Sequence, residues 1–275
     1  MYKKVQYRVL FILIAMLSAT SVVAQEEFID PPSRDLVNIP FEQLTGGIII
    51  LHAKFADFPD TLNFILDTGS SGISLDSTTI KYFGLVPTPS ERSIRGIAGI
   101  RKVSFLYNQS LHFKGLSVDS LNFHINDYSI LTAVYGEKID GIIGFAVLSR
   151  YIVKLDYDKM LVTFSTNGTI RYPRGGYLLR PSFNQLVTQP LRVKDNATIN
   201  SRFLFDLGAG LCMLFSKEFA EDSSLLHKKR KKWVKQGEGL GGKIDMELTV
   251  IKEVKVGPYK FRKVPVFVFD DEYNV

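Results

Sequence analysis

Short runs of alternating or β-branched apolar residues recur along most of the chain and predict a mainly β protein. Turn residues separate the runs, as in Phe58-Pro59-Asp60 and Thr166-Asn167-Gly168. Helical patterns are few: Ser77–Phe83, which Gly84 ends, and Lys217–Lys235. A parallel nucleotide-binding fold would need regular alternation of strands and helices, which this pattern lacks. The predicted strands are Ile48–Ala53, Leu62–Leu66, Val118–Ile125, Tyr151–Leu155, Leu161–Ser165, Phe203–Phe205, Lys243–Val256 and Val264–Phe269.

The first 24 residues have the pattern of a cleaved signal peptide. A basic start with Lys3, Lys4 and Arg8 precedes an almost wholly apolar run, Val9–Leu17, and Val22–Ala24 supplies the small residues of a cleavage site. The apolar run is shorter than the roughly 20 residues that span a bilayer. We therefore expect an exported protein, periplasmic or extracellular, without a stable membrane anchor after cleavage.

The formal net charge of +6 could suggest a nucleic-acid partner, so the location of the charges matters. Three basic residues belong to the predicted signal peptide, and six more stand in one short stretch around Trp233. Without these two groups the chain is slightly acidic, and a single basic run in an exported protein is typical of a solvated helix face, here Lys217–Lys235. We therefore expect no nucleic-acid partner. The six residues are Lys228, Lys229, Arg230, Lys231, Lys232 and Lys235.

Cysteine and histidine usage argues against metal chemistry. The single cysteine, Cys212, can form neither an internal disulfide nor a thiolate zinc site, and the four histidines lack metal-ligand spacing. We expect no metal and no cofactor. From their spacing along predicted strands, Phe203, Phe205 and Phe215 are expected in the core, together with Cys212.

Two segments of the chain repeat one pattern. Phe64–Leu75 (FILDTGSSGISL) matches Phe203–Leu214 (FLFDLGAGLCML), so Asp67 corresponds to Asp206. About 30 residues after each aspartate comes a glycine-rich hairpin tip, followed by a long β run, a turn and another strand. This shared order predicts two copies of one β unit. The hairpin tips are Gly96-Ile97-Ala98-Gly99 and Gly239-Leu240-Gly241-Gly242.

The repeated aspartates suggest a reaction. An aspartate between an apolar strand and a glycine lies in a tight turn at a strand end. Two such turns on two copies of one unit can meet, and carboxylates about 3 Å apart share a proton because they cannot both ionise. The ionised carboxylate would activate a water while the protonated one polarises a carbonyl, which is peptide-bond hydrolysis without a metal, a thiol or a covalent intermediate.

At Asp67-Thr68-Gly69-Ser70 and Asp140-Gly141-Ile142-Ile143-Gly144 the sequence resembles the pepsin and retropepsin families of aspartic proteases. The resemblance covers roughly residues 40–275 and is nearest to exported, retropepsin-like bacterial aspartyl proteases, which often carry a C-terminal PDZ domain. It implies a mainly β, bilobal acid protease fold. The implied division is a signal peptide at 1–24, an N-terminal segment at 25–37, lobe 1 at 38–172 and lobe 2 at 176–275.

The resemblance also implies roles for the motif residues. Asp67 and Asp206 would be the catalytic residues of an aspartic endopeptidase, with a peptide or protein substrate bound between the lobes. Ile142, Ile143 and Gly144 would pack under the first catalytic loop, and the two glycine-rich tips would be flaps. The residues that would support the catalytic loops are Thr68, Gly69, Ser70, Gly208 and Ala209.

The second copy departs from the family pattern. The residue after each catalytic aspartate is usually Thr or Ser, whose hydroxyl bonds across to the opposite lobe. Thr68 fits this pattern and Leu207 does not, so we expect a one-sided grip, and Ala209 lacks the hydroxyl of Ser70. By the spacing of the first copy, a second apolar-apolar-Gly motif would fall near position 288, so we expect lobe 2 to be incomplete within these 275 residues.

Three interpretations stay open. The first is an endopeptidase, and the second is a non-catalytic, peptide-binding pseudoprotease, which Leu207 and the incomplete second lobe favour. The third is an exported β domain in which both aspartates are structural turn residues. Carboxyl oxygens more than about 6 Å apart would favour the third, because a shared proton requires contact.

Overall fold

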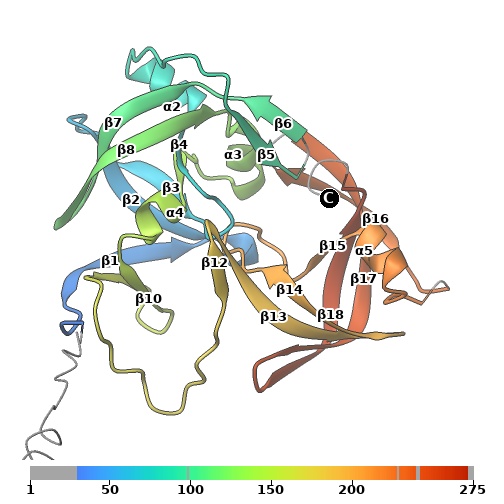
Figure 1. Ribbon diagram of the computed structural model, residues 1–275. Helices are drawn as coiled ribbons and strands as arrows, with labels where there is room; N and C mark the ends of the chain where they lie inside the picture. The colour runs from blue at the N-terminus through green and yellow to red at the C-terminus, as the bar shows by residue number, and fades with distance from the viewer. Residues whose placement is uncertain (1–29, 98, 228, 240–241, 272–275) are drawn as a thin grey trace, which may run out of the picture. The chain divides into compact units, whose positions relative to one another are not determined.

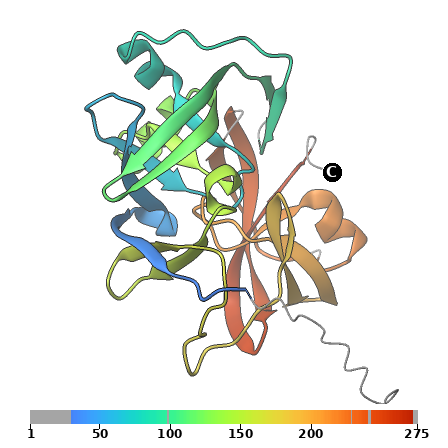
Figure 2. The same cartoon turned by 60° about the vertical axis from the view of Figure 1, so that its left-hand side comes forward.

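The computed structural model describes residues 30–271 except 98, 228, 240 and 241, and residues 33–275 form one compact unit (Figure 1). Strands dominate it in both views, so the mainly β prediction is confirmed (Figure 2). The predicted signal peptide lies outside the described residues. Within the described part of the chain, no helix is long and apolar enough to cross a membrane. The helices are η1 (Thr45–Gly47), α2 (Ser77–Tyr82), α3 (Ser129–Tyr135), α4 (Phe145–Leu148) and α5 (Lys217–Asp222).

The first β unit, residues 35–165, contains a nine-stranded sheet in the order β10-β11-β1-β2-β3-β9-β4-β8-β7. Strand β2 pairs with β3 and also with β7, so the strands from β2 to β7 close into a barrel. Inward-facing side chains such as Phe55, Phe64 and Phe123 fill its core. The strands are β1 (Asp35–Gln43), β2 (Ile49–Phe55), β3 (Leu62–Leu66), β4 (Ile73–Asp76), β7 (Phe105–Phe113), β8 (Leu116–Asn126), β9 (Gly141–Ile143), β10 (Ile152–Asp156) and β11 (Leu161–Ser165).

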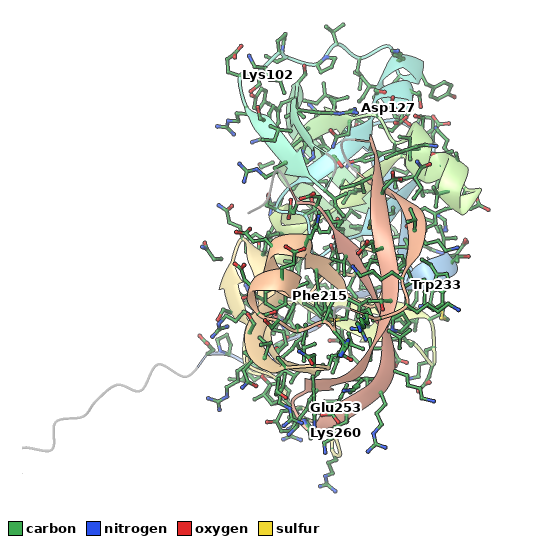
Figure 3. The ribbon with its side chains drawn as sticks, turned by 90° about the vertical axis from the view of Figure 1, so that its right-hand side faces the viewer. Lys102, Asp127, Phe215, Trp233, Glu253 and Lys260 are labelled. Carbon is green, nitrogen blue, oxygen red and sulfur yellow. The ribbon has the colours of Figure 1, made fainter. Side chains whose placement is uncertain are left out.

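The second β unit, residues 182–269, has a seven-stranded sheet with its own core. Its main path is β12-β13-β17-β18-β15, with β14 paired to β13 and β16 paired to β17. Phe215, which is labelled in Figure 3, belongs to this core. It is buried against Phe203 and Phe219. The strands are β12 (Ser182–Asn184), β13 (Leu186–Lys194), β14 (Thr198–Leu204), β15 (Leu214–Ser216), β16 (Trp233–Gly239), β17 (Gly242–Val256) and β18 (Tyr259–Phe269).

The two units repeat one arrangement, as the sequence predicts. In each, a strand leads through an aspartate loop into a short strand and a capped helix; Asp76 caps α2 and Ser216 caps α5. The short strand then pairs in parallel with a long strand, β4 with β8 and β15 with β18. Each unit also has its glycine-rich hairpin, between β16 and β17 in the second unit and between β5 (Ser93–Gly96) and β6 (Gly99–Lys102) in the first.

The units differ beside the aspartate loops. In the first unit, β9 lies between β3 and β4 and covers the end of β3, so Ile65 and Leu66 are buried. Among the described residues of the second unit, no strand lies between β14 and β15. Leu204 is therefore 45% exposed and Phe205 51% exposed, and the prediction that Phe205 is a core residue is wrong.

The expectation that Cys212 is buried is also wrong. Its side chain is exposed, because it lies in the loop before β15 rather than within a strand. Of the three phenylalanines expected in the core from their spacing, Phe215 is buried, Phe203 is partly buried and Phe205 is exposed.

The predicted helix Lys217–Lys235 is too long. Helix α5 ends at Asp222, and Ser224 adopts a left-handed φ of 47°, which stops the helix. The chain then returns as β16 from Trp233. Several basic residues in this stretch have intramolecular partners: Arg230 pairs with Asp195, Lys232 pairs with Glu247, and Lys231 lies over the Trp233 ring.

Candidate active site

Both aspartates start loops of the same local geometry. The first aspartate loop, residues 67–72, joins β3 to β4, and the second, residues 205–213, joins β14 to β15. The N–H of Gly69 donates to Asp67 Oδ1 at 2.6 Å, and the N–H of Gly208 donates to Asp206 Oδ1 at 2.7 Å. Each carboxylate thus forms the same turn with the backbone two residues on, which fixes its direction.

The structure brings the two carboxyl groups together. The Asp67 side chain hydrogen-bonds the Asp206 side chain. A Cβ on Gly69 would lie 2.4 Å from Asp206 Oδ2, and a Cβ on Gly208 would lie 2.5 Å from Asp67 Cγ. Each carboxyl group therefore lies against the glycine of the opposite loop, at a separation that only glycine allows.

Burial and the nearby charge change the acidity of this pair. Burial, the negative charge of Asp206 and the hydrogen bond between the two side chains raise the pKa of Asp67 from 3.8 to about 8, against the opposing effect of the Gly69 and Ser70 N–H groups. The pair therefore retains one proton through acidic and neutral pH. A proton held between two carboxyl groups in contact belongs to the pair rather than to one residue.

This shift predicts how stability depends on pH. An acid with a raised pKa in the folded state stabilises the fold below its unfolded pKa, and the contribution is lost as pH rises through the folded pKa, here from 3.8 to about 8. Asp67→Asn removes the titration, so the variant should lose less stability than the wild type between pH 5 and pH 8, by about 1–3 kcal/mol or roughly 2–12 °C in Tm. Thermal unfolding over this range, with the exposed Asp158→Asn as control, measures it. Parallel curves for wild type and Asp67→Asn would contradict the shared proton.

Thr68 links the two aspartate loops by two further hydrogen bonds. Thr68 Oγ1 donates to the Phe205 carbonyl at 2.6 Å and accepts from the Leu207 N–H at 3.0 Å. Leu207 offers no hydroxyl in return, and its side chain instead packs against the core of the first β unit. The position that matches Ser70 is held by Ala209, which is partly buried. The expected one-sided grip is what the structure shows, with an apolar contact on the other side.

The segment Ile142–Gly144 lies directly against the first aspartate loop. The N–H of Gly144 donates to the Gly72 carbonyl at 3.0 Å, and the N–H of Phe145 donates to the Ser70 carbonyl at 2.8 Å. A Cβ on Gly144 would lie 2.3 Å from the Ser70 oxygen, so the backbone approach requires glycine. Ile142 and Ile143 belong to β9, which pairs with both β3 and β4.

Several supporting side chains were not predicted from the sequence. Ser74 Oγ lies 2.6 Å from the buried Tyr128 hydroxyl and accepts from the Ile142 N–H. His124 lies against Gly72, and burial lowers its pKa to about 4, so its ring is neutral above that pH. Tyr128 follows Asn126 and Asp127 at the end of a strand; only the local helix pattern of residues 129–135, ended by Gly136, could have drawn attention to this region.

The glycine-rich tips form the predicted hairpins. Gly96 pairs with Gly99, and Gly239 pairs with Gly242. Ile97 lies in the turn of the first hairpin. Their function as flaps stays a prediction. Ala98, Leu240 and Gly241 lie outside the described residues.

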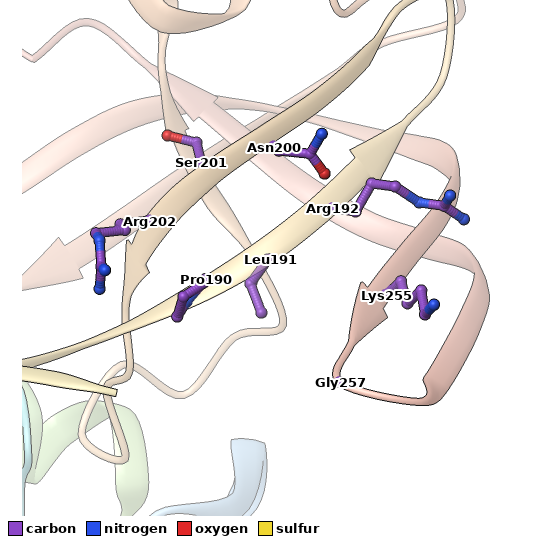
Figure 4. Close-up of a pocket in the computed structure, with 8 residues that line it drawn as sticks. All are labelled: Pro190, Leu191, Arg192, Asn200, Ser201, Arg202, Lys255 and Gly257. Carbon is purple, nitrogen blue, oxygen red and sulfur yellow. The ribbon is translucent and has the colours of Figure 1, made fainter. Parts of the chain in front are cut away.

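One open hollow of about 440 Å³ lies elsewhere, on the second β unit (Figure 4). It is lined by Arg192, Arg202 and Lys255, among others, and contains neither aspartate. Arg192 pairs with Glu253, and Arg202 bonds Ser182. Across the described residues, no group of three or more His, Cys, Asp or Glu side chains is arranged to hold a metal ion.

Comparison with known proteins identifies the family of the chain. The family model described as aspartyl protease matches residues 52–147 and 190–275, about two thirds of the chain, with Asp67 in the first matched segment and Asp206 in the second. The chain belongs to this aspartyl protease family. Among solved structures, a retropepsin-like aspartic protease from Rickettsia conorii is 18% identical, over 49% of this chain and 92% of its own, with a TM-score of 0.35. No curated protein sequence matches the chain.

Proposed function

We propose that this protein is an aspartic endopeptidase that hydrolyses peptide bonds with a water activated between Asp67 and Asp206. The observation that carries the proposal is the contact between the two carboxyl groups, each against the glycine of the opposite loop. Burying two carboxyl groups in contact costs free energy, which a purely structural role for both turns does not explain. The hypothesis of a purely structural role is therefore disfavoured.

The reaction follows from the shared proton. With one proton on the pair, the ionised carboxylate removes a proton from a bound water, and the water oxygen attacks the peptide carbonyl carbon. The protonated carboxyl donates a hydrogen bond to the carbonyl oxygen, where negative charge develops. Proton transfer to the amide nitrogen then allows the C–N bond to break, which leaves a new carboxyl group and a new amine. Each step uses oxygen atoms of Asp67 and Asp206.

Several wider features remain part of the proposal. The N-terminal pattern supports export to the periplasm or the outside of the cell, after cleavage of residues 1–24. The boundaries of lobe 1 at 38–172 and lobe 2 at 176–275 are supported by the two sheets with separate cores. The resemblance of the sequence to exported, retropepsin-like bacterial proteases, which often carry a C-terminal PDZ domain, supports the same proposal.

The test is a cleavage assay with the purified full-length protein. An unfolded protein substrate is incubated between pH 3 and pH 8, with a chelator and a thiol-blocking reagent present, and new termini are identified by mass spectrometry. We expect cleavage that persists with both reagents and disappears in Asp67→Asn. Peptide binding without cleavage at any pH would overturn the proposal in favour of the pseudoprotease.

The leucine at position 207, where the family usually has Thr or Ser, favours the non-catalytic alternative, and its effect on activity can be tested. Leu207 packs on the first core, and apolar burial can replace one hydrogen bond worth about 1 kcal/mol. Leu207→Thr should therefore change kcat/KM by less than about tenfold, or 1.4 kcal/mol in the barrier. Steady-state kinetics on a cleavable peptide measure it. A gain of a hundredfold or more would show that Leu207 impairs the natural protein and would favour the pseudoprotease.

A further inference from the structure

Tyr135 lies close to the second aspartate loop and has no role in the proposed hydrolysis. It is the last residue of α3, which Gly136 ends in a left-handed conformation. Its ring packs on a cluster in the first β unit that includes Ile48, Ile50 and Ile65. Helix α3 also contacts β16, the first strand of the second glycine-rich hairpin. The ring is therefore held by apolar packing on the first β unit, at the end of a helix that contacts that hairpin.

The hydroxyl of Tyr135 reaches the second aspartate loop. It lies 3.2 Å from the position that a Cβ on Gly210 would take, four residues after Asp206. Gly210 is itself fixed against η1, since a Cβ on Gly46 would lie only 2.6 Å from the Gly210 oxygen. Tyr135 and the loop that carries Asp206 therefore have a defined separation, although they come from different β units.

This hydroxyl is available as a hydrogen-bond donor. Burial and the negative charge of Asp206 raise the pKa of Tyr135, so the phenol keeps its proton at neutral pH. The side chain is partly buried, and its hydroxyl makes no hydrogen bond to another residue in the described part of the chain. A ligand that hydrogen-bonds a partly buried, unpaired donor is bound more tightly as a result.

We propose that Tyr135 is a substrate-positioning residue whose hydroxyl hydrogen-bonds the backbone of the bound peptide on the Asp206 side of the dyad. The inference rests on the proposed peptidase function. Peptide backbone is the fitting partner because every residue of an extended substrate offers a carbonyl acceptor, whatever its side chain. The hydroxyl would then help to set the register of the chain between the second aspartate loop and β16.

Tyr135→Phe tests the proposal, because it removes the hydroxyl and keeps the ring. We expect KM for a cleavable peptide to rise about three- to tenfold, as for the loss of one neutral hydrogen bond, with kcat, the pH profile and Tm nearly unchanged. Tyr157→Phe is the matched control, since its ring is 48% exposed against Phe41, and it should match the wild type. A variant Tyr135→Phe with wild-type KM would overturn the proposal, and so would a lowered kcat with a shifted pH profile at constant KM, which would place the hydroxyl on Asp206.

A substrate series locates the bond. Each backbone amide of the peptide is replaced in turn by an ester, which weakens the carbonyl acceptor. One of these esters should raise the KM of the wild type severalfold and leave the KM of Tyr135→Phe unchanged. If no ester affects the wild type more than it affects Tyr135→Phe, the proposal is contradicted. The same comparison can be made by measuring peptide binding to Asp67→Asn with and without Tyr135→Phe. It tests the role of Tyr135 separately from the proposed peptidase function, because binding can be measured even if the wild type cleaves no peptide.

Discussion

Asp67→Asn should abolish peptide hydrolysis by the full-length protein, lowering kcat/KM at least about a thousandfold. The substitution is nearly isosteric, but the amide can neither share the proton of the pair nor accept a proton from water. The variant should remain folded, because the Gly69 N–H that now donates to Asp67 Oδ1 can still donate to the amide oxygen. Asp206→Asn should have an effect of the same size, since the two carboxyl groups act as one unit.

Steady-state cleavage of a quenched peptide measures this effect, and the melting temperature at pH 5 reports on the fold. The exposed Asp158→Asn serves as the control for loss of a carboxylate elsewhere. Activity of Asp67→Asn within a few-fold of the wild type would remove Asp67 from the mechanism. It would also indicate that any cleavage observed in the wild-type preparation comes from a contaminating protease.

Much of the fold was predictable because its signals are local. Runs such as Leu62–Leu66 and Leu161–Ser165 form strands with the predicted bounds, since buried β-branched and apolar residues lie between clear turns. The internal repeat adds information that single strands do not carry, because it places Asp67 and Asp206 at matching positions of two copies of one unit. The hairpins followed from glycines at both ends of each tip.

Other features depend on long-range contacts that composition does not encode. The stretch after α5 looked helical because it is charged and continuous, but pairing with β17 from Trp233 onward decides its structure. Phe205 looked like a core residue because its neighbours alternate, whereas its burial depends on whether a further strand covers β14. Tertiary pairing overrides local pattern in both cases.

The site shows the same division between local and long-range information. The sequence identifies the aspartates and their glycines, because each belongs to a short motif with a local geometry. It does not show that Tyr135 meets Gly210, 75 positions further along, or that Leu207 packs on the opposite core. Both contacts join the second aspartate loop to the first β unit. Leu207 and Ala209 lack the hydroxyl groups that Thr68 and Ser70 have in the first loop. The second aspartate loop therefore depends on contacts with the first β unit for its support.

Each carboxyl group lies against the glycine of the opposite loop, and a single added methyl group can test whether this contact is needed. Gly208→Ala should lower kcat at least about a hundredfold, because the new Cβ would lie 2.5 Å from Asp67 Cγ and must displace the carboxyl group from Asp206. The fold should suffer less, since the clash falls on the end of a side chain rather than on backbone. Gly69→Ala should act in the same way on Asp206, whose Oδ2 would lie 2.4 Å from the new Cβ.

Gly176→Ala is the matched control for Gly208→Ala, because its nearest neighbour to an added Cβ is the Pro173 oxygen at 3.6 Å, an ordinary contact. Cleavage kinetics and thermal unfolding of the three alanine variants separate loss of chemistry from loss of fold. Burial raises the pKa of Asp67 most, but the charge of Asp206 and the hydrogen bond between the side chains raise it further. Separation of the carboxyl groups should therefore lower the pKa of Asp67, and any residual activity of Gly208→Ala should be lost at a lower pH than that of the wild type. Activity of Gly208→Ala within threefold of the wild type would mean that the two carboxyl groups do not need this contact, and the shared proton would lose its place in the mechanism.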